Sequence, residues 1–203
     1  CPFDTYSGYG ARARDVVKAI IELDKYKVEL LSQRWGETSW GFCKDHPEWK
    51  FLYKHLATHE WQKVQPDIWM QITIPNEFQP VGKYNIGLTA GIETTIADGS
   101  WIEGCNKMDL ILTSSNHSKN VFLNSTFFKN GNENDLVKLN KPIEVLIEGL
   151  NLDVYKAIPK QNLKNKELCN YLNSIPEKFA YLTVGHWMQG EMGEDRKNIG
   201  LTI

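Results

Sequence analysis

The chain has 203 residues, of which 41% are hydrophobic, enough for one well-packed domain of ordinary size with a small appendage. Its 23 basic and 25 acidic residues leave a formal charge of -2, which excludes the strong positive field that nucleic-acid binding needs. No apolar run approaches the roughly eighteen residues of a membrane span, and no basic-then-apolar export signal opens the chain. We therefore expect a cytoplasmic protein without nucleic-acid or membrane partners.

Four cysteines, Cys1, Cys43, Cys105 and Cys169, are scattered along the chain without a CxxC pair or a His/Cys cluster at metal-ligand spacing. The even count would allow two disulfides in a secreted protein, but a domain of this size has enough core to fold without them. We therefore expect reduced thiols, no bound metal and no other cofactor.

The first third of the chain is expected to form a helix, one strand and a long connection. Apolar residues at helical spacing predict a helix over residues 10–24, directly after a turn at residues 7–10. The run over residues 26–31 fits a strand of a sheet covered by helices. Residues 33–66 are rich in Trp, His and charged side chains, so we assign them to a connection with a helical pattern only over 48–56.

From residue 67 onward, short β-branched or apolar runs alternate with helical patterns. The expected strands are residues 68–74, 84–89, 110–113, 143–147 and 178–184. The expected helices between them are residues 100–107, 115–123 and 164–172. Ser100 is expected to cap the first of these helices, and residues 124–141 are assigned to a surface connection or a hairpin.

This alternation predicts right-handed βαβ units, and therefore an α/β fold with a Rossmann-like, mostly parallel sheet flanked by helices. In such sheets, ligands bind at the carboxyl ends of the strands. The helix over residues 10–24 has no substantial strand before it, so we expect the opening strand of the domain to precede the sequence.

The first candidate site is the turn that carries Gly8 and Gly10 at a helix start. Small residues let a ligand approach the backbone there, and the first N–H groups of a helix carry partial positive charge. Such a turn suits a phosphate or a sugar hydroxyl, but a plain turn explains the same pattern. Arg12 and Arg14 follow within about one turn of helix, where they face either an anion or solvent.

The second candidate site follows the strand over residues 84–89. Glu93, Thr94 and Thr95 supply a carboxylate and two hydroxyls that could hold a polyol, although Glu93 could equally cap the next helix or pair with a lysine. Asn76 and Glu77 follow the preceding strand and converge on the same edge of the sheet. We assign Asn76, Glu93 and Thr94 to the hydroxyl groups of an acceptor.

The third candidate site lies near the end of the sequence, where Gly185 closes a predicted strand and Arg196 and Lys197 stand at a new helix start. Cations are unfavourable at a helix N-terminus unless an anion binds there. A diphosphate is one such anion, and two solvated cations are the alternative.

Seven tryptophans are a high count for one domain. Five of them fall in predicted loops or short helices: Trp35, Trp40, Trp49, Trp61 and Trp101. Indole rings stack on sugars, but they also fill cores and anchor loops, so we expect only one or two of them to line a cleft.

Five segments of the chain, taken in order, resemble family 4 glycosyltransferases. They are Ser-Gly-Tyr-Gly-x-x-x-Arg at residues 7–14, Gly-Ile-Glu-Thr-Thr at 91–95, Asp-Leu-Ile-Leu-Thr-Ser-Ser-Asn-His-Ser-Lys at 109–119, Val-Leu-Ile-Glu-Gly-Leu-Asn-Leu-Asp-Val-Tyr at 145–155, and Thr-Val-Gly-His-Trp at 183–187 followed by Arg196 and Lys197. The likeness spans nearly the whole chain. Its most specific part is Glu-Gly-Leu-Asn-Leu-Asp-Val-Tyr, which is similar to the family's Asn-Gly-Val-Asp-x-x-x-Phe.

The resemblance implies the two-domain GT-B fold, with residues 1–176 as a Rossmann-like acceptor-side domain and 177–203 as the beginning of a nucleotide-sugar-binding domain. It implies transfer of a sugar from a nucleoside diphosphate sugar to a glycan or another hydroxyl acceptor, with retention at the anomeric carbon and no required metal. The residues that it puts beside the donor phosphates are Gly8, Gly10, Gly185, Arg196 and Lys197.

The family's acidic catalytic motif belongs to the second domain, so the resemblance assigns no catalytic residue here and implies that the chain alone does not turn over. Two other functions suit the same pattern. One is a nucleotide-sugar epimerase of the same two-domain shape, and the other is a non-catalytic sugar-binding or interaction module.

Overall fold

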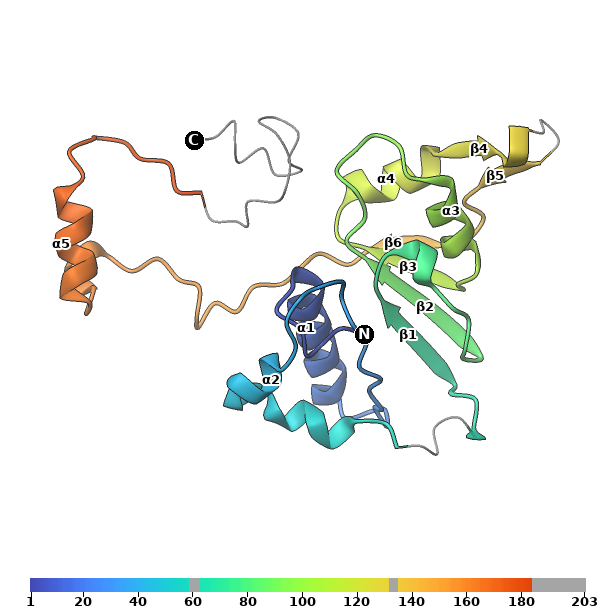
Figure 1. Cartoon of the computed structure of the whole chain (residues 1–203), viewed down its shortest axis with the longest axis horizontal. Coiled ribbons are helices and arrows are strands. Elements are labelled where there is room, and N and C mark those ends of the chain that lie inside the picture. Colours follow the sequence, from blue (N-terminus) through green and yellow to red (C-terminus); the bar gives the residue numbers. More distant parts are fainter. Residues whose placement is uncertain (59–62, 132–134, 184–203) are drawn as a thin grey trace. The chain divides into compact units, whose positions relative to one another are not determined.

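The computed structural model describes residues 1–58, 63–131 and 135–183 of the chain (Figure 1). The chain divides into two units, Cys1–Leu150 and Asn151–Ile203, which we describe separately. The division falls at residue 150, and the domain border expected at residues 176 and 177 stays a prediction.

A sheet of four parallel strands forms the centre of the first unit (Figure 1). The strands are β1 (Ile68–Ile72), β2 (Tyr84–Thr89), β3 (Leu110–Thr113) and β6 (Ile143–Val145), and they lie in this order. The registers pair Ile72 with Leu88, Leu88 with Leu112, and Thr113 with Val145. All four carboxyl ends therefore meet at one edge, and the α/β fold with a parallel sheet is confirmed.

Three helices of this unit begin at residues whose side chains cap them. Helix α1 (Gly8–Glu22) starts after Ser7, whose Oγ accepts a hydrogen bond from the Gly10 N–H, and α4 (Asn116–Asn124) starts after Ser115 in the same way. Helix α3 (Gly99–Asn106) is capped by Asp98, which accepts a hydrogen bond from the Ser100 N–H. The expectation that Ser100 is the cap is therefore wrong, because Ser100 already lies within the first helical turn.

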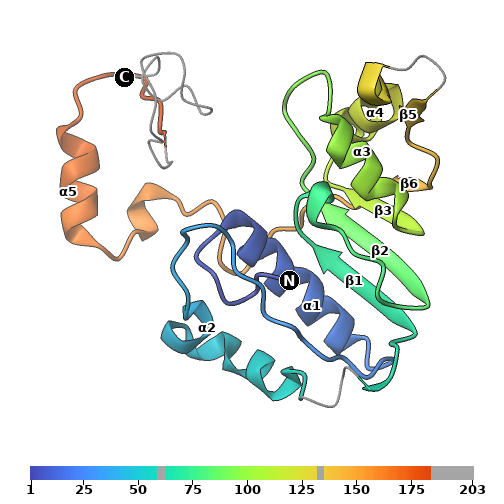
Figure 2. The same cartoon turned by 45° about the vertical axis from the view of Figure 1, so that its right-hand side comes forward.

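Two hydrophobic cores cover the two faces of the sheet. Ala13 and Val17 of α1 pack with Ile72 and Leu88 in one core, and Figure 2 shows α1 running alongside β1 and β2. Helices α3 and α4 build the other core around Ile111 of β3 and Ile143 of β6. Leu112, the neighbour of Ile111, packs against the first core, because successive side chains of a strand point to opposite faces.

The expected strand over residues 26–31 is wrong. Only Leu30 of this segment forms a β-bridge. Its N–H donates to His55 O at 2.7 Å, and its carbonyl accepts a hydrogen bond from the Ala57 N–H at 3.0 Å. Its partner segment is the end of the 3-10 helix η1 (Pro47–His55), which cannot extend a ladder along a strand. The helical pattern expected over 48–56 corresponds to η1, and the short helix α2 (Phe42–Asp45) precedes it.

Residues 124–141, expected to form a surface connection or a hairpin, contain a hairpin. Strand β4 (Thr126–Phe128) pairs antiparallel with β5 (Leu136–Lys138), and the short 3-10 helix η4 (Lys129–Gly131) follows β4. A further 3-10 helix, η3 (Pro75–Glu77), connects β1 to β2. The hairpin separates α4 from β6, so it lengthens the crossover between β3 and β6 without adding a strand to the parallel sheet.

In the second unit, the described residues form the 3-10 helix η5 (Lys160–Asn162) and the helix α5 (Lys166–Ser174). Helix α5 agrees with the helix expected over 164–172, and Asn165 caps it. Residues 178–183 are exposed and not paired as a strand, so the strand expected from residue 178 is wrong over its described part. An apolar run forms a strand only where a neighbouring strand satisfies its backbone groups, and the described part of this unit offers none.

Within the described ranges, no helix is both long enough and apolar enough to cross a bilayer. The same part of the chain contains no group of three or more His, Cys, Asp or Glu side chains arranged to hold a metal ion.

Candidate functional site

A pocket of about 320 Å³ opens at the carboxyl edge of the parallel sheet. Its walls come from the segments that follow β2, β3 and β6: Ala90, Gly91, Ile92, Glu93, Ser114, Ser115, His117, Ser118 and Glu148. This is the edge at which parallel α/β folds bind their ligands. The pocket therefore has the position that the sequence pattern predicts for a binding site.

Serine hydroxyls at the start of α4 hold the loop after β2 in place. The Ala90 carbonyl accepts hydrogen bonds from Ser114 Oγ at 2.9 Å and from Ser118 Oγ at 3.2 Å. Ser115 Oγ donates to Ser118 Oγ at 3.2 Å and accepts from the Ser118 N–H at 3.1 Å. Three hydroxyls on one wall are thus oriented before any ligand arrives.

Gly91 allows the loop to pack closely against α4. Its φ is +81°, in the left-handed region, and a Cβ built on it would lie 2.4 Å from both Cβ and Oγ of Ser118. The same Cβ would lie 3.1 Å from Oγ1 of Thr113, which is buried and has no hydrogen-bond partner among the described residues. No larger residue fits at position 91 without moving the pocket wall.

Tyr9 connects the start of α1 to this pocket. Its hydroxyl lies 2.9 Å from Thr89 Oγ1 and accepts a hydrogen bond from the Ala90 N–H at 3.1 Å. Burial raises the pKa of Tyr9 above its ordinary value, and the negative charges of Glu148 and Glu77 raise it further, against the opposing effect of its two hydrogen bonds. Tyr9 therefore stays a neutral phenol at neutral pH.

The charge of the pocket walls is negative. Glu93 and Glu148 contribute carboxylates, and no Lys or Arg is among the described residues that line the pocket. The Arg12 guanidinium donates to Leu146 O at 2.6 Å and to Ile147 O at 3.3 Å. These contacts hold the chain just before Glu148.

The residues expected beside donor phosphates have different surroundings. A Cβ on Gly10 would lie 2.4 Å from Thr5 O, and the Gly10 N–H donates to Ser7 Oγ, so this glycine is needed for packing. Gly8 faces open space, with nothing within 4 Å of a Cβ built on it. Its role at a phosphate stays a prediction, and Gly185, Arg196 and Lys197 lie outside the described residues.

Arg14 does not face a ligand. Its side chain is buried and donates to Phe3 O at 2.7 Å and to Thr5 O at 3.0 Å. The guanidinium carbon lies 3.4 Å from the centre of the Phe42 ring. Both alternatives considered for this arginine, an anion contact and solvent, therefore give way to a structural role in holding the N-terminal segment.

The three residues assigned to acceptor hydroxyls are only partly brought together. Glu93 lines the pocket, and Thr94 adjoins it, with its carbonyl 3.2 Å from His117 Nε2 and its Oγ1 donating to Ile96 O. Asn76 is exposed in η3, where its backbone N–H lies against Gly104 of α3, and it does not line the pocket. The binding roles of all three stay predictions.

Sequence reasoning missed most of the residues that build the pocket. From the sequence, Ser115 is only the first residue of an expected helix, and Glu148 is only part of a stretch that resembles the glycosyltransferase family. Both lie just after parallel strands, so the rule that ligands bind at strand carboxyl ends was a sufficient signal for them. Tyr9 carries no such signal, because its contact with Ala90 joins segments 81 positions apart.

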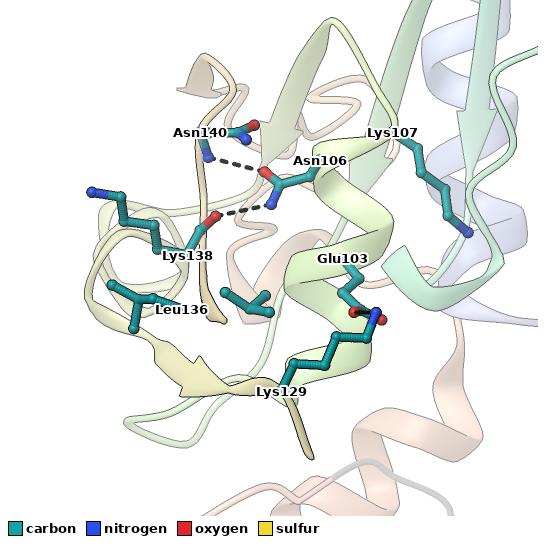
Figure 3. Close-up of a pocket in the computed structure, with 8 residues that line it drawn as sticks. Glu103, Asn106, Lys107, Lys129, Leu136, Lys138 and Asn140 are labelled. Atoms are coloured by element: carbon teal, nitrogen blue, oxygen red, sulfur yellow. Dashed lines mark hydrogen bonds and ion pairs between the residues drawn. The ribbon is translucent and has the colours of Figure 1, made fainter. Parts of the chain in front are cut away.

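A second, larger hollow of about 520 Å³ lies between α3 and the hairpin (Figure 3). It is lined by Glu103, Asn106, Lys107, Lys129, Leu136, Val137, Lys138 and Asn140. Lys129 pairs with Glu103 at 2.8 Å, and Figure 3 shows the Lys107 and Lys138 side chains pointing away from each other. Because Lys129 and Glu103 neutralise each other and the other two lysines diverge, we regard the smaller pocket as the functional one despite its size.

No family model matches the chain, and neither a curated protein nor a solved structure shows significant similarity to it. Function is therefore argued from the chemistry of the pocket.

Proposed function

We propose that this chain is the acceptor-side part of a glycosyltransferase, which moves a sugar from a nucleoside diphosphate sugar to a hydroxyl group of a glycan or a similar acceptor. The observation that carries the proposal is a pocket at the carboxyl edge of a parallel sheet whose polar lining consists of carboxylates, serine hydroxyls and one histidine. The family resemblance of the sequence supports the same function.

The lining suits a neutral polyol better than a phosphate. A sugar hydroxyl donates a hydrogen bond to a carboxylate or to a serine Oγ, and both kinds of acceptor line the pocket. A phosphate would meet Glu93 and Glu148 without a lysine or arginine among the described lining residues. The pocket is thus an acceptor site in this proposal, and the donor belongs to a second, facing domain of a GT-B fold.

The reaction also gives the pocket's carboxylates a role. The acceptor oxygen forms a bond to the anomeric carbon while the bond from that carbon to the diphosphate oxygen breaks on the same face, and the hydroxyl proton passes to the carboxylate that accepts its hydrogen bond. A carboxylate hydrogen-bonded to that hydroxyl stabilises the developing positive charge on it. By the resemblance, Arg196 and Lys197 stabilise the negative charge on the departing diphosphate. The resemblance also implies retention of configuration at the anomeric carbon and no required metal.

The test is a transfer assay on the full-length product of the gene that encodes this chain. Uridine, guanosine and adenosine diphosphate sugars are each combined with a panel of neutral glycans, and released nucleoside diphosphate and extended glycan are both measured. We expect Glu93→Gln and Glu148→Gln each to lower kcat/KM by roughly 10- to 100-fold, the effect of losing a hydrogen bond to a charged group. Glu103→Gln, in the hollow beside the hairpin, is the matched control and should leave kcat/KM unchanged.

Three results would count against the proposal. Glycan binding without transfer for any donor would favour a non-catalytic sugar-binding module. Conversion of a nucleotide sugar in the absence of an acceptor would favour an epimerase. Transfer that is insensitive to both pocket substitutions would show that the acceptor binds elsewhere.

A further inference from the structure

A second organised surface adjoins the pocket at the end of β1. Glu77 closes η3, and its Oε2 accepts hydrogen bonds from Gln33 Nε2 at 2.9 Å and from Thr73 Oγ1. The Glu77 carboxylate is exposed, and an exposed glutamate without partners samples several rotamers. Two donors on one oxygen hold this carboxylate in a single orientation at the surface.

An aromatic ring lies in the same segment as Gln33. Trp35, two residues further along, stacks on Tyr9 with ring centres 4.1 Å apart and an angle of 29° between the planes. Trp35 is half-buried, so part of the indole is available to solvent. Because the Tyr9 hydroxyl bonds to the N–H of Ala90, a single tyrosine ring separates Trp35 from the pocket wall.

We propose that Gln33, Trp35 and Glu77 form a second sugar subsite, so that the acceptor is an oligosaccharide and not a single sugar or a simple alcohol. The inference rests on the proposed function: the unit that receives the new sugar occupies the pocket, and the next unit lies over Trp35. The apolar face of a pyranose ring packs on indole while its hydroxyls donate to a fixed carboxylate, which is the combination present here.

Charge distinguishes a sugar from the other ligand that stacks on tryptophan, the base of a nucleotide. A nucleoside diphosphate stacked on Trp35 would bring its negative charge close to Glu77 and, across Tyr9, to Glu148. The two carboxylates oppose such a ligand and accept hydrogen bonds from a neutral one. The surface therefore favours a neutral glycan unit.

The experiment is a calorimetric titration of the full-length protein with two sets of probes. The first set is the methyl glycosides of glucose, galactose and mannose, and the second is disaccharides of the same sugars. We expect the best disaccharide to bind at least tenfold tighter than its methyl glycoside. Trp35→Ala and Glu77→Gln should each weaken disaccharide binding about 5- to 10-fold and leave methyl glycoside binding unchanged.

Two substitutions serve as matched controls. Trp40→Ala removes an exposed indole from the same segment, and Glu22→Gln removes an exposed carboxylate at the far end of α1. Neither should change the Kd of either probe set. Trp35→Phe keeps a ring against Tyr9, so it covers the case in which Trp35→Ala fails to fold, and it should weaken only the disaccharide, by about two- to threefold.

The outcomes separate this inference from the proposed function. The subsite is refuted if methyl glycosides bind but disaccharides bind no tighter. It is also refuted if Trp35 and Glu77 variants with unchanged melting temperatures retain full disaccharide affinity. In either case, Gln33 and Glu77 only tie the loop to β1. If neither probe set binds, the acceptor pocket itself is refuted.

Discussion

Replacement of Gly91 by alanine tests the geometry on which the pocket depends. The left-handed backbone at this residue, with φ at +81°, costs an alanine about 1–2 kcal/mol. The new Cβ would also lie 2.4 Å from the Cβ and Oγ of Ser118, and overpacking of this kind costs about 1–3 kcal/mol. We therefore expect Gly91→Ala to lower the free energy of unfolding by about 2–5 kcal/mol and to abolish sugar binding in the pocket.

Urea denaturation followed by tryptophan fluorescence measures the effect, with sugar affinity measured on the same preparations. Gly8→Ala is the control, because Gly8 is helical and faces open space, so alanine there should be neutral or stabilising by up to about 1 kcal/mol. A Gly91→Ala protein within about 0.5 kcal/mol of the parent that still binds sugar would refute the close packing of the loop on α4.

Other consequences of the structure are testable by simpler measurements. Asp98→Ala should lower the free energy of unfolding by about 1 kcal/mol through loss of the α3 cap, whereas Asp98→Asn should change it little, and urea midpoints compare the two. Burial raises the pKa of the Cys43 and Cys105 thiols to about 12, so iodoacetamide at pH 8 should label Cys169 in the folded protein and reach Cys43 and Cys105 only in urea, as read by mass spectrometry. The unfolded chain releases these thiol protons near pH 9 and the folded protein retains them, so the free energy of unfolding should fall as the pH rises from about 9 to 12. Cys105→Ala should reduce that fall. A rise in the urea midpoint between pH 8 and 10 would contradict the predicted direction.

The parallel sheet could be predicted from the sequence because its strands are buried on both faces. The apolar runs over 84–89 and 110–113 coincide with β2 and β3 to the residue, since such strands read as near-continuous β-branched or aliphatic segments. The run over 26–31 is similar in composition but lies against the 3-10 helix η1, so it forms only one bridge. Composition indicates that a segment can be a strand, whereas the presence of a partner decides whether it is one.

The candidate site could be predicted only as far as its edge of the sheet. Asn76 and Glu93 both follow parallel strands and are equivalent by that rule, but only Glu93 lines the pocket. Arg12 and Arg14 looked equally suited to an anion, but backbone carbonyls accept hydrogen bonds from both guanidinium groups, 134 positions away for Arg12 and 11 for Arg14. Such choices depend on contacts between distant segments, which spacing along the chain does not reveal.

Amide chemical shifts measured during titration with a neutral glycan test the central claim most directly, because they report where the ligand binds on the folded chain. We predict saturable shifts at residues 90–93 and 114–118, on both sides of the pocket, with little change in the hairpin. Shifts confined to the hairpin and the end of α3, or no saturable shift with any neutral glycan, would contradict an acceptor site at the carboxyl edge of the sheet.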